Sequence, residues 1–227
     1  RGEVKPAAAY GMIRMNGVTY LEGEDTATMD KLMLKTATDI RGNKSLRLES
    51  DYLNADITGI FSFRNMINSA DLFIRNYLAH FNLKDSLEVK DEAPPQVMRF
   101  ILEFGDVNEV TRMFLPFLKI SPGTILSGYF DTRQSLFRLE GSSPLLSLYG
   151  MDMSNWQLDA ESTTRELRLN TGCRNFYLTR SESSDTLDIK FDTLELSGLI
   201  RHDTILYDLG WNSKYGHSFL NGVLSFL

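Results

Sequence analysis

Few side chains in this sequence have the types and spacing that chemistry requires. The three histidines, His80, His202 and His217, lie far apart, and none has a second ligand-type residue two to four positions away, as metal sites on one element usually do. The single cysteine, Cys173, would need a positioned base to act as a nucleophile, and no motif supplies one. We therefore expect ordinary histidines, an inert and half-buried thiol in a turn beside a strand, and no metal site.

Paired carboxylates are the next candidate, because general acid–base catalysis can use two of them. Asp188 and Asp192 share one face of an alternating stretch, but Lys190 lies between them on the same face. A solvated strand surface explains all three charges. The motifs of serine hydrolases, phosphate-binding loops, dinucleotide-binding turns and zinc metalloproteases are also absent from the sequence. The sequence therefore predicts a protein that is not an enzyme and has no cofactor.

Composition narrows the class of protein further. The 227 residues are 42% hydrophobic and 24% charged, enough to build a core, and their net charge of −6 argues against nucleic acid as a partner. One cysteine excludes an internal disulfide. The longest apolar runs, such as Met113–Leu118, are much shorter than the roughly 18 residues that cross a bilayer. Because Arg1-Gly2-Glu3 contains neither an initiator methionine nor a leader, we expect a piece of a larger polypeptide.

The dominant pattern is an alternation of apolar and polar residues, which places the apolar side chains on one face of a β-strand. It runs from Leu53 to Phe63, longer than most strands, and Gly59 indicates a bend or a bulge there. Turn-rich pieces follow at intervals of roughly 8–12 residues, which is typical of an antiparallel meander. The expected C-terminal strands are Trp156–Ala160, Leu167–Leu169, Leu187–Phe191 and Ile205–Trp211, and the expected turns are 131–134, 141–144, 163–164 and 181–185.

Two segments have the spacing of amphipathic helices instead. Residues 65–82 carry apolar side chains at helical intervals, Tyr77 among them. A second helix is expected from Asp106 to about Phe117, where Asp106 and Glu109 have the spacing of a capping box. Each expected helix follows a strand, the second one after Val97–Phe104. The chain therefore contains two similar strand-and-helix units.

A connector at Asp91–Pro95 separates these units, so we expect two parts, residues 1–93 and 94–227. The predicted fold class is mainly β with two helices (α+β), in which the strands form a long antiparallel meander. Something must cover the apolar strand faces. A second sheet or the two helices would give a closed core, which is the commoner arrangement. The alternative is an open, U-shaped β-groove whose apolar side faces lipid.

Two stretches favour the groove. They are SDYLNADITGIFSF at residues 50–63, followed by the first expected helix, and ISPGTILSGYF at residues 120–130, followed by successive alternating strands. In both, the chain resembles TamB-type proteins, the inner-membrane-anchored translocation and assembly module subunits of Gram-negative bacteria, which are related to AsmA. The resemblance covers roughly residues 45–212 and rests on strand patterns and small motifs.

The resemblance implies a non-catalytic periplasmic protein with an apolar β-groove, whose parent is anchored in the inner membrane. Proteins of this family are thought to move phospholipid toward the outer membrane and to assist outer-membrane protein assembly with a BamA-like barrel as partner. Two helices in a short stretch are more than such a groove would carry. The candidate lipid-contacting residues are Leu53, Ile57, Phe61, Phe63, Trp156, Leu158, Leu167, Leu169, Leu187, Ile189 and Phe191.

A closed β-rich binding module on a bacterial cell surface is the alternative, with a glycan or a protein as its ligand. Trp156 and Trp211 could stack on sugar rings there, although both lie on apolar strand faces, where core packing is commoner. An unclosed apolar face would favour the lipid hypothesis over this one, and an enzyme would require paired carboxylates in a cleft.

Overall fold

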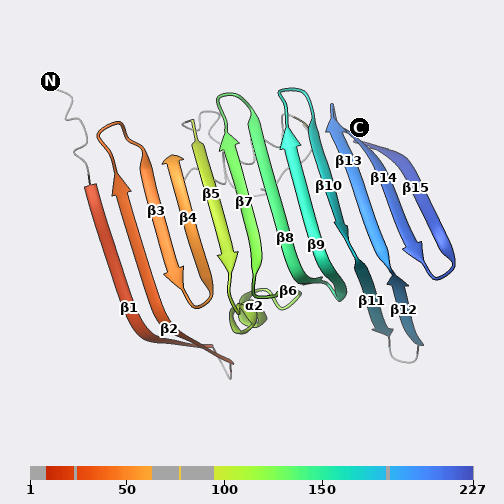
Figure 1. Ribbon diagram of the computed structural model, residues 1–227, viewed down its shortest axis with the longest axis horizontal. Helices are drawn as coiled ribbons and strands as arrows, with labels where there is room; N and C mark the ends of the chain where they lie inside the picture. The colour runs from red at the N-terminus through yellow and green to blue at the C-terminus, as the bar shows by residue number, and fades with distance from the viewer. Residues whose placement is uncertain (1–8, 23–24, 63–76, 78–94, 183–184, 227) are drawn as a thin grey trace.

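The computed structural model describes residues 9–22, 25–62, 77, 95–182 and 185–226, which form one sheet of 15 strands and one short helix (Figure 1). All the strand pairs in the sheet are antiparallel. Within the described residues, no helix is long and apolar enough to cross a membrane. The predicted antiparallel meander in a mainly β chain is therefore confirmed.

The strands follow one another in chain order from β1 at one edge to β15 at the other, except that β6 pairs with β8, and β11 and β12 extend from β9, off this path. The helix α2 lies at the lower end of the sheet in Figure 1. The bounds are β1 Ala9–Glu22, β2 Asp25–Thr38, β3 Lys44–Ser50, β4 Leu53–Ile60, β5 Val97–Phe104, α2 Asn108–Phe114, β6 Leu118–Ile120, β7 Thr124–Asp131, β8 Leu136–Leu148, β9 Met151–Ser162, β10 Leu167–Cys173, β11 Asn175–Glu182, β12 Asp185–Phe191, β13 Thr193–Arg201, β14 Thr204–Ser213 and β15 Gly216–Ser225.

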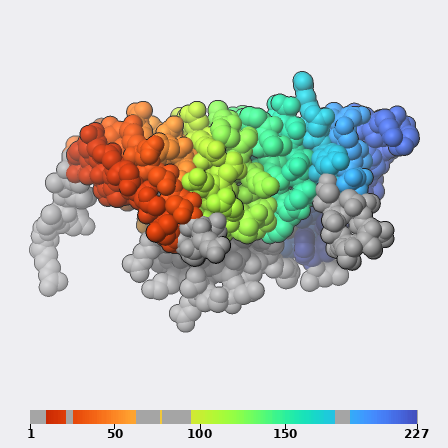
Figure 2. Space-filling model, turned by 90° about the horizontal axis from the view of Figure 1, so that it is seen from below, coloured from red at the N-terminus to blue at the C-terminus, as the bar shows by residue number. Residues whose placement is uncertain are grey.

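The described sheet is open. Among the described residues β1 pairs only with β2, and β15 pairs only with β14, so each edge of the sheet has an unpaired side. Viewed from the lower end, the coloured strands form one broad band from β1 in red to β15 in blue (Figure 2). All the described strands belong to this one sheet, so they provide no second sheet to cover it.

One face of the sheet carries a row of directly paired residues that crosses the whole sheet. Polar residues such as Asp56, Glu140 and Asp159 alternate with this row and share the opposite face. We call the two sides the apolar face and the polar face. The row on the apolar face consists of Ile13, Leu34, Leu48, Ala55, Leu102, Leu126, Gly141, Leu158, Thr171, Leu196, Leu209 and Leu220.

Glycine makes room for aromatic rings on the apolar face. Gly128 of β7 pairs directly with Phe100 of β5, and a Cβ atom at Gly128 would lie 2.5 Å from the ring of Phe100 and 2.7 Å from the Arg138 carbonyl oxygen. The Phe100 side chain therefore lies across the backbone of its neighbour. Such aromatic–glycine pairs let large rings lie flat on a sheet without separating the strands.

Four neighbouring strand segments shift their alternation by one residue at about the same level of the sheet. On each, successive apolar-face residues are three positions apart instead of two, for example Met153 and Trp156 on β9, or Phe191 and Leu194 across the β12–β13 junction. Below this level a second row continues the apolar face. Its members are Ile120, Leu146, Met153, Phe176 and Phe191.

The second row joins the first because Phe191 packs against Trp211. Their ring centroids are 5.7 Å apart, and Phe176 stacks on Phe191 at 5.8 Å. Trp211 pairs with Leu194 on the apolar face. Because of the shift, β8 and β9 extend beyond their neighbours and pair with β6 and β11. Their apolar side chains remain on the apolar face there.

Several predicted boundaries are wrong. Residues 141–144 are not a turn but lie inside β8, because this segment pairs with β7 and β9. There the Ser143 hydroxyl hydrogen-bonds with Thr124 Oγ1 at 2.6 Å and donates to the Leu145 carbonyl at 2.9 Å. Cys173 ends strand β10 and does not lie in a turn. The strand expected at Leu53–Phe63 is β4, which ends at Ile60. Its pairing passes through Gly59 without an inserted residue. Gly59 has φ +138°, and a Cβ there would meet the Val97 backbone.

The helix at Asp106 to Phe117 is present but shorter, since α2 spans Asn108–Phe114. The predicted capping box is wrong. Val107 is the N-cap, and the Asp106 carboxylate accepts hydrogen bonds from Asn108, while Glu109 accepts from the Tyr52 hydroxyl instead. The predicted helix at 65–82, apart from Tyr77, and the connector at Asp91–Pro95, apart from Pro95, lie outside the described residues.

Candidate functional site

The structure places the predicted lipid-contacting residues of β4, β9 and β10 on the apolar face. Leu53 and Ile57 pair directly with Phe104 and Phe100 of β5. Farther along the sheet, the paired strands β9 and β10 contribute four residues to the same face, namely Trp156, Leu158, Leu167 and Leu169. Residues more than 90 positions apart in the sequence therefore share one surface.

The other predicted residues have mixed outcomes. Ile189 and Phe191 lie on β12, where Ile189 pairs with Leu178 and Phe191 belongs to the second apolar row. Phe61 follows β4 and is 4% exposed, and the Lys44 ammonium group donates a hydrogen bond to its carbonyl oxygen at 2.7 Å. The side chains of Phe63 and Leu187 lie outside what the structure describes.

The strands between these two groups carry apolar-face residues that the sequence interpretation did not single out. Leu102 and Phe100 of β5, Leu126 and Phe130 of β7, and Leu139 of β8 fill the face between β4 and β9. The alternation in Val97–Phe104 was a usable signal for β5. With these residues included, the row on the apolar face runs from Ile13 of β1 to Leu220 of β15, and its members without an apolar side chain are Gly141 and Thr171.

The upper end of the apolar face is covered by Tyr77. This end is at the top of Figure 1, where the β7–β8, β9–β10 and β13–β14 turns lie. Tyr77 is 2% exposed and packs with Phe130, and the half-buried side chains Met98, Phe137, Leu167 and Ile200 surround the pair. Burial raises the pKa of the Tyr77 hydroxyl above its ordinary value. Tyr77 and Phe130 are thus enclosed at this end, within a ring of half-buried apolar side chains.

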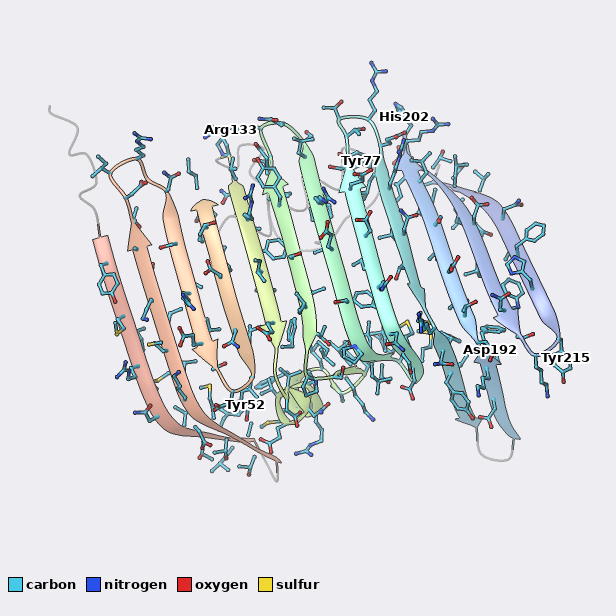
Figure 3. All side chains as sticks on the ribbon, in the orientation of Figure 1. Tyr52, Tyr77, Arg133, Asp192, His202 and Tyr215 are labelled. Carbon is cyan, nitrogen blue, oxygen red and sulfur yellow. The ribbon has the colours of Figure 1, made fainter. Side chains whose placement is uncertain are left out.

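The lower end is held by a different group. The Tyr52 hydroxyl donates to the Thr28 carbonyl at 2.6 Å and to Glu109 Oε2 at 3.1 Å, and Glu109 Oε2 also accepts from the Thr28 backbone N–H at 3.3 Å. Tyr20 of β1 contacts Phe114 of α2, with ring centroids 5.6 Å apart. In this way the long β1–β2 hairpin and the helix are joined below β3 and β4, at the side where Figure 3 labels Tyr52.

The polar face has an open hollow of about 1060 Å³ over β7 to β13. Three carboxylates, Glu140, Asp159 and Glu195, line it together with small or uncharged residues such as Ser127 and Gly172, and Arg174 is the one cationic residue in its lining. None of the described lining residues is aromatic. The hollow is therefore acidic and offers no ring on which a sugar could stack.

The residues considered for catalysis are not brought together. Cys173 is buried, and desolvation raises the pKa of its thiol, which opposes the thiolate that a nucleophile needs. The side chains of Asp188, Lys190 and Asp192 are exposed, and His217 bonds to Asn212 at 2.9 Å. Within the described residues, no group of three or more His, Cys, Asp or Glu side chains could hold a metal ion.

Comparisons of the chain with protein-family models, with curated proteins and with solved structures gave no match.

Proposed function

We propose that this chain is a non-enzymatic segment of a TamB/AsmA-like periplasmic protein, and that its apolar face carries phospholipid acyl chains during transport and outer-membrane assembly. The observation that carries the proposal is the row of directly paired apolar residues from Ile13 to Leu220 on an open sheet. An acyl chain laid across the strands would meet apolar side chains along most of its length, the exceptions in the row being Gly141 and Thr171. A parent anchored in the inner membrane and a BamA-like partner are part of the same proposal.

The energetics suit transfer. Burying an acyl chain contributes roughly 0.8 kcal/mol per CH₂ group, so a sixteen-carbon chain would gain about 12 kcal/mol, close to what it loses on leaving a bilayer. We call the row from Ile13 to Leu220 the central row. Most of its side chains, such as Leu102, Leu126 and Leu158, are only half-buried and can gain contacts. Near-equal affinity for sheet and membrane allows exchange in both directions.

The charge of the two faces orients the lipid. On the middle of the polar face Glu140 is paired with Arg138 at 2.7 Å, and the carboxylates of Asp159 and Glu195 disfavour anionic phospholipid head groups there. The apolar face has no charged member in its central row. The head groups would therefore lie at the ends of the apolar face, where the turns meet water.

Photo-crosslinking tests the choice of face. A photoreactive amino acid at Leu158, in the central apolar row, should capture phospholipid when the purified chain is mixed with vesicles of phosphatidylethanolamine and phosphatidylglycerol. The matched control is Asp159, the next residue on the same strand but on the polar face. Equal capture at both positions, or none at Leu158, would count against the proposal.

A charge substitution separates an open face from a packed core. Ile189 is half-buried in the second part of the apolar face. In a closed core Ile189→Asp would bury an unpaired carboxylate and would cost several kcal/mol, enough to unfold a marginal domain. On an open face we expect the chain to remain folded by circular dichroism while lipid capture falls. An unfolded Ile189→Asp chain, with Lys190→Asp folded, would indicate a packed core.

A further inference from the structure

Tyr77 lies against the upper end of the apolar face, where it packs with residues that are far from it in the sequence. It packs with Phe130, and Met98, Phe137 and Leu167 pack against this pair. These residues belong to β5, β7, β8 and β10, so the cluster built on Tyr77 and Phe130 draws on several strands of the sheet. In Figure 3 Tyr77 lies at the same end of the sheet as the labelled residues Arg133 and His202, which belong to two of the upper turns.

The polar atoms of Tyr77 are held by the upper turns. Its hydroxyl donates to the Thr163 carbonyl at 2.5 Å, after the end of β9, and to the Ser135 carbonyl at 3.3 Å, before the start of β8. Its own carbonyl oxygen accepts a hydrogen bond from the Asp203 backbone N–H at 3.0 Å, in the β13–β14 turn. One residue is therefore hydrogen-bonded to three turns, which connect β7 to β8, β9 to β10 and β13 to β14.

This arrangement differs from simple core packing because an acyl chain cannot replace it. A hydrocarbon could occupy the space of the ring, but it has no hydroxyl group to donate to the Thr163 carbonyl. Displacing Tyr77 would break this part-buried hydrogen bond to the Thr163 carbonyl, and a hydrocarbon cannot re-form it. Leu158 of the central row has an aliphatic side chain without a hydroxyl group. Its paired neighbours along the row are Gly141 and Thr171.

We propose that Tyr77 is a stopper that excludes acyl chains from the upper end of the apolar face. It would confine them to the central row and to the second row below it. The inference rests on the proposed function, and it adds a rule for where on the sheet a lipid can lie. Lipid would then occupy the region around Leu158 and Trp156 and would be absent around Leu167 and Phe137.

The test uses a phospholipid with a photoreactive diazirine near the end of its acyl chain, in phosphatidylethanolamine vesicles, so that no residue under study is replaced by a probe. Labelled residues are mapped by mass spectrometry. In the unaltered chain we expect labelling at Leu158 and little at Leu167. In Tyr77→Ala, labelling at Leu167 should rise by about tenfold, the change that corresponds to about 1.4 kcal/mol in relative occupancy.

Tyr52→Phe is the matched control, because Tyr52 also donates its hydroxyl to a backbone carbonyl but at the opposite end of the sheet. It should leave labelling at Leu167 unchanged. Circular dichroism and thermal unfolding establish that each variant is folded. If Tyr77→Ala does not fold, Tyr77→Phe decides: raised labelling at Leu167 supports the stopper, and unchanged labelling overturns it.

The outcomes separate the two proposals. Labelling at Leu158 in all chains, with no increase at Leu167 in folded Tyr77→Ala, overturns the stopper and leaves the lipid-carrying face intact. Equal labelling of Leu158 and Leu167 in the unaltered chain also overturns the stopper. Absence of labelling at both residues in every chain overturns the proposed function, and the stopper with it.

Discussion

Phe130 and Leu220 lie on the same face of one sheet but have opposite surroundings. Phe130 of β7 is 5% exposed, and Leu220 of β15 is 50% exposed. Phe130 has paired strands on both sides and the Tyr77 ring against it, whereas β15 has β14 as its one described neighbour. Alternation in the sequence thus determines which face a side chain shares. Its burial depends on what the neighbouring strands and Tyr77 contribute.

The two strands also differ on the polar face. β7 places Ser127, Tyr129 and Asp131 there, while β15 places the exposed residues Phe219 and Val223 there. No charged residue or proline occurs between Gly216 and Ser225. Charges and prolines are what usually keep a free strand edge from pairing with another chain. The pattern of β15 is therefore that of an interior strand, although its outer edge is unpaired in the described structure.

The largest expected difference is in the effect of truncating the two side chains. Phe130→Ala should lower the free energy of unfolding by about 3–5 kcal/mol, because it opens a cavity beneath the enclosed Tyr77 ring. Leu220→Ala should cost less than about 1 kcal/mol, since half of that side chain is already in water. Urea unfolding of both variants measures this. Similar losses would show that the apolar face is covered equally at both places.

A smaller effect is expected from adding a methyl group to the apolar face. Gly128→Ala should cost roughly 1–3 kcal/mol, because its Cβ atom would collide with the Phe100 ring and the Arg138 carbonyl. Gly198→Ala on β13 is the control. There the nearest atoms lie 3.8 Å from the added Cβ, an ordinary contact, so unfolding should change little. Equal losses would contradict the account of aromatic–glycine pairing.

Much of the strand pattern could be predicted from the sequence, because alternation is a local property. β5 has the predicted bounds Val97–Phe104, and β9, β10, β12 and β14 contain the expected stretches. The one-residue shift of alternation could not be predicted, since it depends on four strands changing together at one level. Near Pro144 the sequence at this shift has the composition of a turn. The pairing of β8 with β7 and β9 shows that the strand continues through it.

The site was predictable in part for the same reason. Trp156 and Leu158 alternate on one strand, so their shared face follows from spacing alone. Tyr77 lies in a stretch with helical spacing, but its hydroxyl partners are 58 and 86 residues away in the sequence. No local pattern indicates which turns a distant tyrosine will reach. The Glu109 contact with Tyr52 is a similar case, because a residue with capping-box spacing bonds to another strand pair.

Burial also changes the pKa of two enclosed side chains, and with it the pH dependence of stability. Burial raises the pKa of both Cys173 and Tyr77, so the folded state favours their neutral forms. Their contribution to stability is fully present below the unfolded-state pKa values, about 8.5 for a thiol and about 10 for a phenol, and is lost as pH rises through the folded-state values. The free energy of unfolding should therefore decline above about pH 8.5.

Cys173→Ala tests that origin. Without the thiol, the decline should begin at higher pH, where only the phenols titrate. Urea unfolding measured at several pH values between 7 and about 10.5 gives the comparison. A free energy of unfolding that rises with pH over this interval in the unaltered chain would contradict the burial of these two groups.

The smallest effect on folding is expected at the free edge, and there a charge should change association instead. Leu220→Asp should alter the free energy of unfolding by no more than about 0.5 kcal/mol, because the carboxylate can reach water from a residue that is 50% exposed. A charge on an unpaired strand edge opposes pairing with a second strand, so self-association at high protein concentration should fall. Ile40→Asp is the control, since Ile40 is 76% exposed in the turn between β2 and β3 and adds the same charge away from the edge. Sedimentation velocity over a range of concentrations compares the two variants with the unaltered chain. If both carboxylates reduce association equally, net charge is the cause and the edge of β15 has no special role. If Leu220→Asp unfolds the chain, β15 is covered as fully as β7, and the contrast between the two strands is wrong.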